Sequence, residues 1–286
     1  MKDKVMLAKE FILGMTIKND TSEFSTPPLG WKAAEKFDGY RALFKYEDSE
    51  NGKVGRFYSR NGKPFNAPEW FIKSMPPPQL LGDKILDGEL WAGRNNFQSM
   101  GVVRKKIPIP EEWLMIQYQV YDITTSKDIF INRLKELKKI VDFTQKAWSI
   151  RLKNEDFYLP NDTTIESPLV FAKQTKITSE KMMNKYYENI IQNGGEGIML
   201  KHPLSLYEDG RSSYMLKFKP AFDRECIIID YKLGEGKYNG LLGSFICKPL
   251  INHDTYMSID NDENHIFTLS GMDDKIRNNY KTTHPE

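Results

Sequence analysis

The sequence predicts an α+β fold, in which short strands of mixed order combine with a few helices. Three observations lead to this prediction. Strand-like runs are separated by turn dipeptides such as Asn51-Gly52 and Asn61-Gly62. Only two stretches show long helical periodicity, and they do not alternate with the strands as a doubly wound sheet would require. The 286 residues are 40% hydrophobic and 28% charged, which suffices for one large domain, or for one large and one small domain.

The first part of the chain is predicted to consist mainly of strands. Apolar residues within 5–15 indicate a short helix. After it, β-branched and aromatic residues gather in short runs that end at turn residues, including the triple proline at 76–78. These runs predict strands at 40–46, 54–59, 84–91 and 114–123.

Two longer helices are predicted in the middle of the chain. In residues 129–148, apolar residues such as Leu134 and Leu137 recur at helical spacing with charged residues between them. Residues 178–193 form the second helix, which ends at Gly194-Gly195 because glycine commonly terminates helices.

A domain boundary is predicted near Pro220. After this residue the helical patterns stop, and strand-like runs with glycine-rich turns follow, which is typical of a small β-barrel. The chain is therefore expected to divide into a domain of residues 1–220 and a domain of residues 221–286. Strands on both sides of the boundary are predicted at 196–201, 214–219, 225–232, 242–248 and 265–270.

The bulk composition excludes several classes of protein. The net charge of +2 gives no general positive field for nucleic acid, so any such surface must be local. Cys226 and Cys247 do not form a CxxC pair, and with only four histidines the chain predicts no zinc site. Two such thiols fit a reducing, intracellular compartment. Lys9 and Glu10 interrupt the first apolar run, which predicts neither a signal peptide nor a membrane partner.

Five segments place charged residues within strand-like stretches. The first is Glu35-Lys36-Phe37-Asp38-Gly39-Tyr40-Arg41, in which Lys36 is a candidate nucleophile. A lysine attacks only as the neutral amine, so Lys36 needs cations or a metal nearby, because its acidic neighbours favour the charged form. Converging strands would bring lysines, arginines and carboxylates into one cleft suited to phosphates and Mg²⁺. The other four segments are 59–62, 86–90, 196–201 and 216–220.

Each segment alone also has a purely structural interpretation. Leu86-Asp87-Gly88-Glu89-Leu90 could form the edge of a hairpin. Lys217 and Lys219 could lie on the solvated face of an amphipathic strand. The conjunction of five segments in one order favours a functional site.

In that order the segments resemble the motifs of the covalent nucleotidyltransferases, and most closely those of the small ATP-dependent DNA ligases of viral and minimal bacterial type. Past the boundary, Gly234-Glu235-Gly236-Lys237-Tyr238 and Leu241-Leu242-Gly243-Ser244 are similar to the opening of the family's OB domain. The earlier motifs are Lys36-Phe37-Asp38-Gly39-Tyr40-Arg41, Ser59-Arg60-Asn61-Gly62-Lys63-Pro64-Phe65, Leu86-Asp87-Gly88-Glu89-Leu90-Trp91, Gly93-Arg94, Phe97-Gln98, Val120-Tyr121-Asp122-Ile123, 196–201 and 216–220.

The resemblance implies a fold, an activity and its partners. The first domain would be an adenylyltransferase domain of ATP-grasp-like DNA ligase type with mixed and antiparallel sheets, and the second an OB-fold β-barrel. The protein would be a monomer that seals 3′-OH/5′-phosphate nicks in duplex DNA with ATP and Mg²⁺ or Mn²⁺. It would work in the cytoplasm or nucleus through an AMP carried on Lys36.

The resemblance also assigns roles to residues. Lys36, Asp38, Lys217 and Lys219 would be catalytic. Tyr121 would stack on adenine, and Glu196 and Glu89 would contact the metal. The residues expected to bind the nucleotide are Glu35, Arg41, Arg60, Glu89, Tyr121, Glu196, Lys201, Lys217 and Lys219. Those expected to bind DNA are Arg41, Arg60, Lys63, Arg94, Arg104, Lys105 and Lys106. The last five of these could instead form a solvated charged face.

The sequence departs from the family in two places. Glu35 directly precedes Lys36, whereas many larger ligases place the acid one position earlier, where this chain has Ala34. The family's OB domain continues with further strands and a basic motif, whereas this sequence ends at Glu286. The OB domain is therefore expected to be incomplete at its C-terminus, with slow adenylylation of Lys36 and sealing of pre-adenylylated nicks retained.

Two other functions stay open at this point. The first is a related enzyme, either an RNA ligase or a GTP-dependent mRNA capping guanylyltransferase. The second is a catalytically impaired clamp that only binds nucleic acid. Intact Lys36, Glu196 and Lys217 argue against the clamp.

Overall fold

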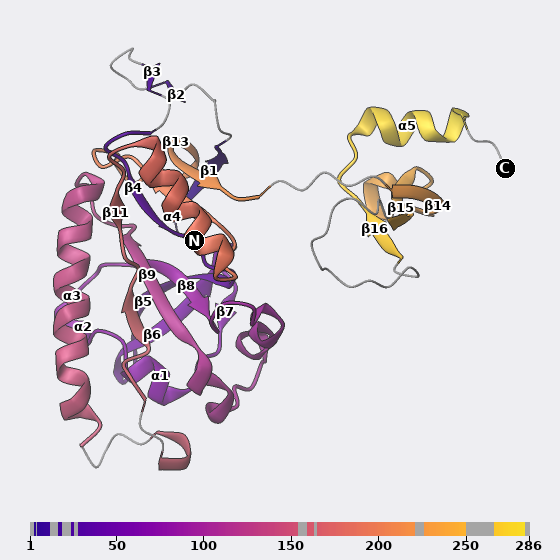
Figure 1. Ribbon diagram of the computed structural model, residues 1–286. Coiled ribbons are helices and arrows are strands. Elements are labelled where there is room, and N and C mark those ends of the chain that lie inside the picture. Colours follow the sequence, from indigo (N-terminus) through magenta and orange to yellow (C-terminus); the bar gives the residue numbers. More distant parts are fainter. Residues whose placement is uncertain are drawn as a thin grey trace. The chain divides into compact units, whose positions relative to one another are not determined.

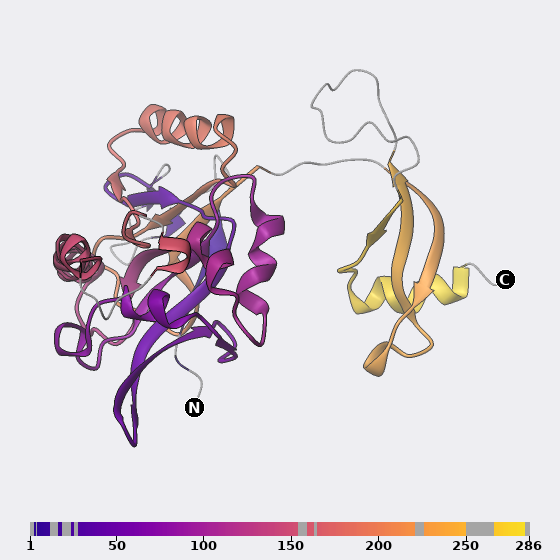
Figure 2. The same cartoon turned by 90° about the horizontal axis from the view of Figure 1, so that it is seen from below.

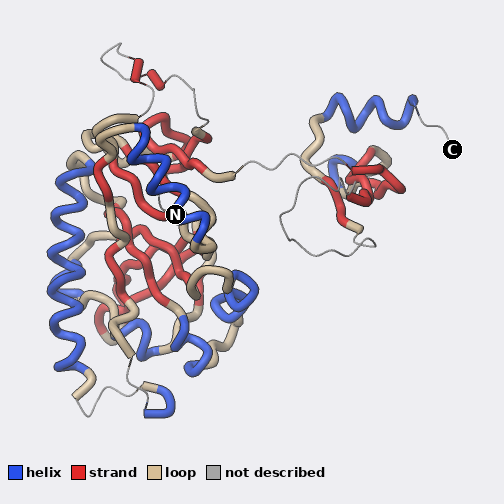
Figure 3. Tube along the Cα trace, viewed as in Figure 1, coloured by secondary structure: helices blue, strands red, loops and turns tan. Residues whose placement is uncertain are grey.

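The chain forms two compact units, Met1–Pro220 and Ala221–Glu286 (Figure 1). The structure is a computed structural model, and it describes Asp3 and residues 5–11, 17–18, 24–25, 28–153, 159–162, 165–220, 226–249 and 266–283. In the first unit, strands form the interior and helices lie around them (Figure 3).

A six-stranded sheet forms one half of the first unit. Its order is β10-β9-β8-β5-β6-β7, and only β10 and β9 run parallel. The strands are β5 (Tyr40–Ser49), β6 (Gly52–Ser59), β7 (Pro64–Phe65), β8 (Leu86–Trp91), β9 (Gln117–Ile123) and β10 (Leu169–Phe171). Alternation of apolar and polar residues along them buries aromatic side chains such as Phe44 and Phe57, whose ring centroids are 4.8 Å apart.

A five-stranded sheet forms the other half, in the order β1-β13-β12-β4-β11. Strand β1 runs parallel to β13, and the other pairs are antiparallel. The strands are β1 (Met6–Glu10), β4 (Lys32–Glu35), β11 (Thr175–Lys176), β12 (Ile198–Lys201) and β13 (Gly210–Phe218). A separate short hairpin pairs β2 (Ile17–Lys18) with β3 (Phe24–Ser25).

Each sheet has its own helix and its own core. Helix α3 (Phe130–Arg151) packs on β9 and β10, beside the six-stranded sheet (Figures 1 and 2). Helix α4 (Glu180–Gln192) packs Met183 and Ile190 into the core of the five-stranded sheet, and its first turn is capped by Ser179 Oγ, which accepts from the Met182 amide at 3.1 Å. Shorter helical segments are α1 (Glu69–Lys73), α2 (Pro78–Leu81), η1 (Phe97–Arg104), η2 (Pro110–Met115) and η3 (Pro160–Asp162).

The second unit is a three-stranded antiparallel sheet with one helix. Its order is β14-β15-β16, made of β14 (Cys226–Leu233), β15 (Leu242–Pro249) and β16 (Phe267–Leu269), with the turn η4 (Gly236–Tyr238) between the first two. Helix α5 (Asp274–Thr283) packs against β15, with the rings of Tyr280 and Phe245 edge to face at 4.9 Å between centroids. Within residues 226–249 and 266–283 these strands form an open sheet rather than a closed barrel.

Most of the predicted elements are present at the expected places. The strands expected around 40–46, 54–59, 84–91, 196–201, 214–219, 225–232, 242–248 and 265–270 are confirmed, as are both long helices. The strand expected at 114–123 begins later, at Gln117, because the 3₁₀ segment η2 occupies residues up to Met115. Strands β4, β10 and β11 were not expected.

Two predictions were wrong. Residues 6–10 of the expected helix at 5–15 form β1, because pairing with β13 outweighs local helix propensity, and residues 12–15 lie outside the described residues. The expectation of no helix after Pro220 fails at α5, whose many polar residues obscure its helical pattern.

Candidate active site

Lys36 lies on the segment that crosses from one sheet to the other. It directly follows β4, and its amide donates to the Gly197 carbonyl oxygen at 2.8 Å. Gly39, three residues on, packs against β8 so closely that a Cβ there would lie 2.2 Å from the Leu90 carbonyl oxygen. Glycine is therefore required in the K-x-D-G-x-R motif for steric reasons. The motif holds Lys36 between the two sheets.

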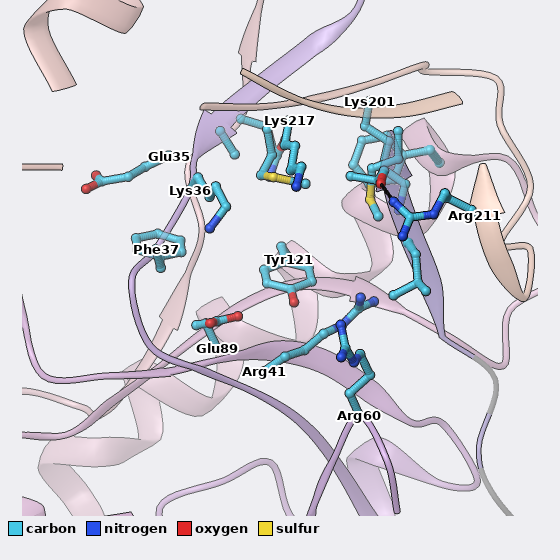
Figure 4. Close-up of a pocket in the computed structure, with 17 residues that line it drawn as sticks. Glu35, Lys36, Phe37, Arg41, Arg60, Glu89, Tyr121, Lys201, Arg211 and Lys217 are labelled. Atoms are coloured by element: carbon cyan, nitrogen blue, oxygen red, sulfur yellow. Dashed lines mark hydrogen bonds between the residues drawn. The ribbon is translucent and has the colours of Figure 1, made fainter. Parts of the chain in front are cut away.

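A cavity of about 320 Å³ opens around Lys36 within the first unit. Figure 4 shows Lys36, Tyr121 and Arg41 directed towards a common space, while Glu35 points away from it. Both sheets contribute to the wall, since β1, β4, β12 and β13 come from one and β5, β8 and β9 from the other. The residues that line it are Leu7, Ala8, Ala34, Glu35, Lys36, Phe37, Arg41, Arg60, Glu89, Tyr121, Phe130, Gln174, Met199, Lys201, Arg211, Met215 and Lys217.

The ammonium group of Lys36 forms an ion pair with Glu196. Lys36 Nζ donates to Oε2, while the other oxygen, Oε1, lies 4.0 Å from Lys219 Nζ. The carboxylate paired with Lys36 is thus that of the distant Glu196, whereas its acidic neighbours in the sequence are Glu35 and Asp38. Glu196 lies between two lysines, which compensates its charge.

Glu35 and Lys217 have partners of their own. Both Glu35 oxygens accept from Arg94, at 2.7 Å from Nε and 2.8 Å from Nη2, which is a bidentate pair. Lys217 Nζ lies 3.0 Å from Glu10 Oε1, and Glu10 is its register partner on β1. Arg94, expected to bind DNA, therefore engages a residue expected to bind the nucleotide.

Arg41 is fixed in the cavity wall by Asp87. Its Nε and Nη2 donate to the two Asp87 oxygens at 2.9 and 2.6 Å, and Nη1 donates to the Met6 carbonyl oxygen at 2.7 Å. Burial opposes the charge, yet the Asp87 carboxylate raises the pKa of Arg41 well above its ordinary value. Arg41 is therefore a permanent cation with a fixed orientation.

Glu89 and Tyr121 occupy the floor of the same cavity. Burial raises the pKa of Glu89 to about 8, although Arg41 and Lys36 act in the opposite direction. The Tyr121 hydroxyl donates to the Gly88 carbonyl oxygen at 3.3 Å, and the Arg41 guanidinium lies 6.0 Å from the centre of its ring.

Lys201 belongs to a buried charged network next to the cavity. Its Nζ donates to Asp122 Oδ2, and Arg133 Nε donates to the other oxygen at 2.7 Å. Burial alone would raise the pKa of Asp122, but Lys201 and Arg133 lower it below the ordinary value. Lys201 lines the cavity and is expected to bind the nucleotide, and its first partner in the structure is Asp122.

The remaining predicted residues lie at the surface. Arg60 is exposed and reaches the cavity wall. Asp38 is exposed next to Lys36, and partial desolvation followed by the charge of Glu196 raises the pKa of Asp38. Lys63 and Lys106 are exposed on the side of β7 and η1.

Two further basic residues of that surface have contacts within the chain. Arg104 lies over the Tyr40 ring at 6.0 Å, and Lys105 pairs with Glu112 at 2.6 Å. The outer basic residues expected to bind DNA are thus exposed, whereas Arg41 and Arg94 are held by Asp87 and Glu35.

Sequence reasoning missed several residues of the cavity. Arg211 brings a further cation from β13, and Gln174, Phe130, Met199 and Met215 complete the wall. A signal for Arg211 was present in the sequence. Arg211 follows Gly210 at the start of β13, the strand that also carries Lys217 and ends just before Lys219. Leu7 and Ala8 could not be expected, since they depend on the pairing of β1 with β13.

The carboxylates of the described residues do not form a metal cage. No group of three or more His, Cys, Asp or Glu side chains converges among them. Glu196 and Glu89 can each offer a carboxyl oxygen at the cavity, which fits Mg²⁺ held mainly by phosphates and water with one or two protein oxygens. The described residues also contain no helix long and apolar enough to span a bilayer.

These features suit a ligand with both phosphates and an aromatic ring. Lys36, Lys217, Arg41 and Arg211 supply positive charge at one cavity, and Tyr121 supplies an aromatic face. The volume is that of a small-molecule site.

Comparison with known proteins places the chain among DNA ligases. The sequence pattern of the ATP-dependent DNA ligase domain matches residues 6–219. A DNA ligase of Haemophilus influenzae is 27% identical over 222 residues, which are 78% of this chain and 70% of that protein. A DNA ligase of Methanosphaerula palustris is 33% identical over 227 residues, but the match covers 74% of this chain and only 36% of that protein. The chain thus spans little more than a third of the length of this archaeal relative.

Solved structures show the same fold. A structure from a study of DNA binding by Lig E DNA ligases has a TM-score of 0.66 at 23% identity and covers 97% of this chain and 88% of that one. The Chlorella virus DNA ligase-adenylate has a TM-score of 0.52 at 17% identity, covering 99% and 90% of the two chains. Because the domain pattern covers most of the sequence, this chain belongs to the ATP-dependent DNA ligase family.

Proposed function

We propose that this protein seals nicks in duplex DNA, joining a 3′-hydroxyl to a 5′-phosphate with ATP. The observation that carries the proposal is the position of Lys36 at a cavity with Tyr121, Glu89 and five further cationic side chains (Figure 4). The membership of the ATP-dependent DNA ligase family supports it. The protein would act inside the cell, in the cytoplasm or nucleus. It would act as a monomer.

In the first step Lys36 Nζ attacks the α-phosphorus of ATP. The Lys36 ammonium first loses one proton to water, which gives the neutral amine. The N–P bond then forms, the bond to pyrophosphate breaks, and Nζ loses a second proton. Glu196 Oε2 already accepts a hydrogen bond from Nζ, so it is placed to take that proton. Lys217, Lys219 and Arg211 would neutralise the phosphates, and Tyr121 would hold the adenine.

In the second step a 5′-phosphate oxygen of the nick attacks the same phosphorus, and the N–P bond breaks, which regenerates the lysine. In the third step the 3′-hydroxyl attacks the activated 5′-phosphorus and releases AMP. Asp38 lies exposed beside Lys36 and would face the 3′-hydroxyl. Partial burial and the charge of Glu196 raise the pKa of Asp38, which makes its carboxylate a stronger base than that of an ordinary aspartate.

Mg²⁺ or Mn²⁺ supplies further charge neutralisation when it is bound with the phosphates. Glu196 and Glu89 would be its protein contacts. Glu35, held by Arg94, and Lys201, held by Asp122, would line the nucleotide site, while Arg41 and Arg60 would reach both the nucleotide and the nick phosphate.

The outer basic residues would track the DNA backbone. Lys63, Arg104, Lys105 and Lys106 are exposed, and Arg94 would join them at the cavity rim. Contacts of this kind give affinity without sequence preference, which suits an enzyme for any nick. Residues 1–220 would be the adenylyltransferase domain, and residues 221–286 would be the OB-fold domain.

The test is a sealing assay on a nicked duplex with ATP and Mg²⁺, run beside Lys36→Ala. Wild-type protein should gain one AMP by intact mass and should seal the nick, whereas Lys36→Ala should do neither while keeping its circular dichroism. Sealing by Lys36→Ala of a nick that carries no AMP would refute the proposal. Labelling with GTP in place of ATP, or sealing of RNA alone, would instead favour the capping or RNA ligase alternatives.

A further inference from the structure

Tyr207 is a half-buried residue whose hydroxyl joins three groups behind the cavity. It lies in the connection between β12 and β13. Its hydroxyl donates to Asp87 Oδ2 at 2.7 Å and accepts from the Met6 amide and from Arg41 Nη2, both at 3.3 Å. The same hydroxyl therefore contacts the carboxylate that orients Arg41 and the guanidinium itself.

These contacts close a ring of hydrogen bonds. Arg41 Nη1 donates to the Met6 carbonyl oxygen at 2.7 Å, and its Nε and Nη2 occupy both Asp87 oxygens. Asp87 thus accepts from two guanidinium nitrogens and one hydroxyl. Removing the hydroxyl leaves the carboxylate one donor short and takes away one of the two acceptors of Arg41 Nη2.

The ring face of Tyr207 touches the second charged network. Lys201 Nζ lies 5.3 Å from the ring centroid and Arg133 Cζ lies 5.7 Å from it. The connection that carries Tyr207 is fastened to the same network, because Arg133 Nη1 donates to the Ser205 carbonyl oxygen at 2.9 Å. The Phe130 amide donates to that oxygen as well, at 2.8 Å. Tyr207 contacts both networks, through its hydroxyl on one side and its ring on the other.

We propose that Tyr207 is a positioning residue that fixes two cavity cations, Arg41 through its hydroxyl and Lys201 through its ring. Both cations line the cavity. Tyr207 itself takes no part in bond formation or proton transfer. The effect is preorganisation, in which a long side chain is held in one orientation before the ligand arrives. The expected effect of Tyr207 on the rate of AMP attachment rests on the proposed function. Its expected effect on the orientation of Arg41 rests on the geometry alone.

Two substitutions separate the roles of the hydroxyl and the ring. Tyr207→Phe removes only the hydroxyl, whereas Tyr207→Leu also removes the aromatic face. In single-turnover experiments, Tyr207→Phe should lower the maximal rate of AMP attachment to Lys36 by between about tenfold and about a hundredfold, with little change in the half-saturating ATP concentration. Tyr207→Leu should lower it further. In an Arg41→Lys background, Tyr207→Phe should add almost nothing, because both changes act on one interaction.

Tyr46→Phe is the matched control. The Tyr46 hydroxyl donates to the Pro76 carbonyl oxygen at 3.0 Å, away from the residues that line the cavity. It should leave the rate of AMP attachment unchanged. A loss of rate in Tyr46→Phe equal to that in Tyr207→Phe would overturn the proposal, because any lost tyrosine hydroxyl would then suffice.

A spectroscopic measurement keeps the inference independent of activity. The Arg41 Nε–H signal of ¹⁵N-labelled protein is assigned by its loss in Arg41→Lys. We expect its exchange with water to become faster in Tyr207→Phe and to stay unchanged in Tyr46→Phe. An unchanged Arg41 signal in Tyr207→Phe overturns the positioning role, whatever the rate of the variant. If wild-type protein attaches no AMP, the proposed function fails while this signal still decides the role of Tyr207.

Discussion

Lys36 is paired with a carboxylate, Glu196, that lies 160 residues further along the chain. The pair joins the segment after β4 to the start of β12, and the Lys36 amide bonds to Gly197 beside it. The nucleophile of the proposed reaction is therefore held by two contacts to one neighbouring segment. Its position depends on the pairing of β4 with β12.

Removing the charge of Glu196 should slow AMP attachment more than it destabilises the fold. In Glu196→Gln the group that would take the proton from Lys36 is lost, and general-base contributions of this kind are about a hundredfold or more. The rate is measured by intact mass after rapid mixing with ATP and Mg²⁺. Glu69→Gln is the control, because Glu69 pairs with Lys73 on α1. A Glu196→Gln rate equal to that of the control would contradict the assigned role.

Adding one methyl group at Gly39 should damage both stability and activity. The new Cβ would lie 2.2 Å from the Leu90 carbonyl oxygen, so β8 and the motif must separate. Overpacking of this kind costs about 1–3 kcal/mol, and the shift displaces Lys36 and Arg41. Urea unfolding and AMP attachment are the measurements. Gly101→Ala is the matched control, since a Cβ at Gly101 meets nothing within 4 Å, and equal behaviour of the two variants would refute the steric argument.

Asp122→Asn should be the most destabilising of these changes. It leaves Lys201 and Arg133 without their shared carboxylate, and breaking a buried ion pair costs about 3–5 kcal/mol. Chemical unfolding at neutral pH measures this loss. Asp142→Asn, which removes an exposed partner of Lys138 on α3, should change stability by about 0.5 kcal/mol or less.

The cost of Asp122→Asn should also depend on pH. The pKa of Asp122 in the folded protein lies below its ordinary value of 3.8, so the stability that it contributes is fully present above 3.8. That contribution is lost as the pH falls through the folded-state pKa. The difference between wild type and Asp122→Asn should therefore narrow in acid, and a difference that widens there would contradict the lowered pKa.

Lys106→Ala should weaken DNA binding without changing AMP attachment. If Lys106 neutralises one DNA phosphate, its loss should reduce the slope of log K against log salt concentration by about 0.9. Fluorescence anisotropy with a nicked duplex at several salt concentrations gives this slope. Lys138→Ala, on α3, should leave it unchanged. Equal slopes for wild type and Lys106→Ala would place Lys106 outside the DNA interface.

The parts of the fold that depend on local pattern were predictable. The strands β5, β6 and β8 and the helices α3 and α4 have clear periodicity and turn signals, and the motif around Lys36 lies at the cavity. The parts that depend on distant partners were not. Strand β1 has the composition of a helix and becomes a strand only beside β13.

The same limit applies to the charged residues of the site. The sequence brought Lys36, Glu89, Tyr121 and Lys217 together, and all four line one cavity. It could not show which ion pairs form, because each involves groups from different strands, and Tyr207 carries no signal beyond its place between two motifs.

The parallel pairing of β1 with β13 also sets an order of events during synthesis. Glu10 lies opposite Lys217 in that pairing, and β1 supplies Leu7 and Ala8 to the cavity wall. Among the described strands β1 pairs with β13, so a chain emerging from the ribosome lacks this pairing until nearly the whole first unit has been translated. Until then the cavity has no wall on that side, so, on the proposed function, nascent chains shorter than this unit should be unable to acquire AMP.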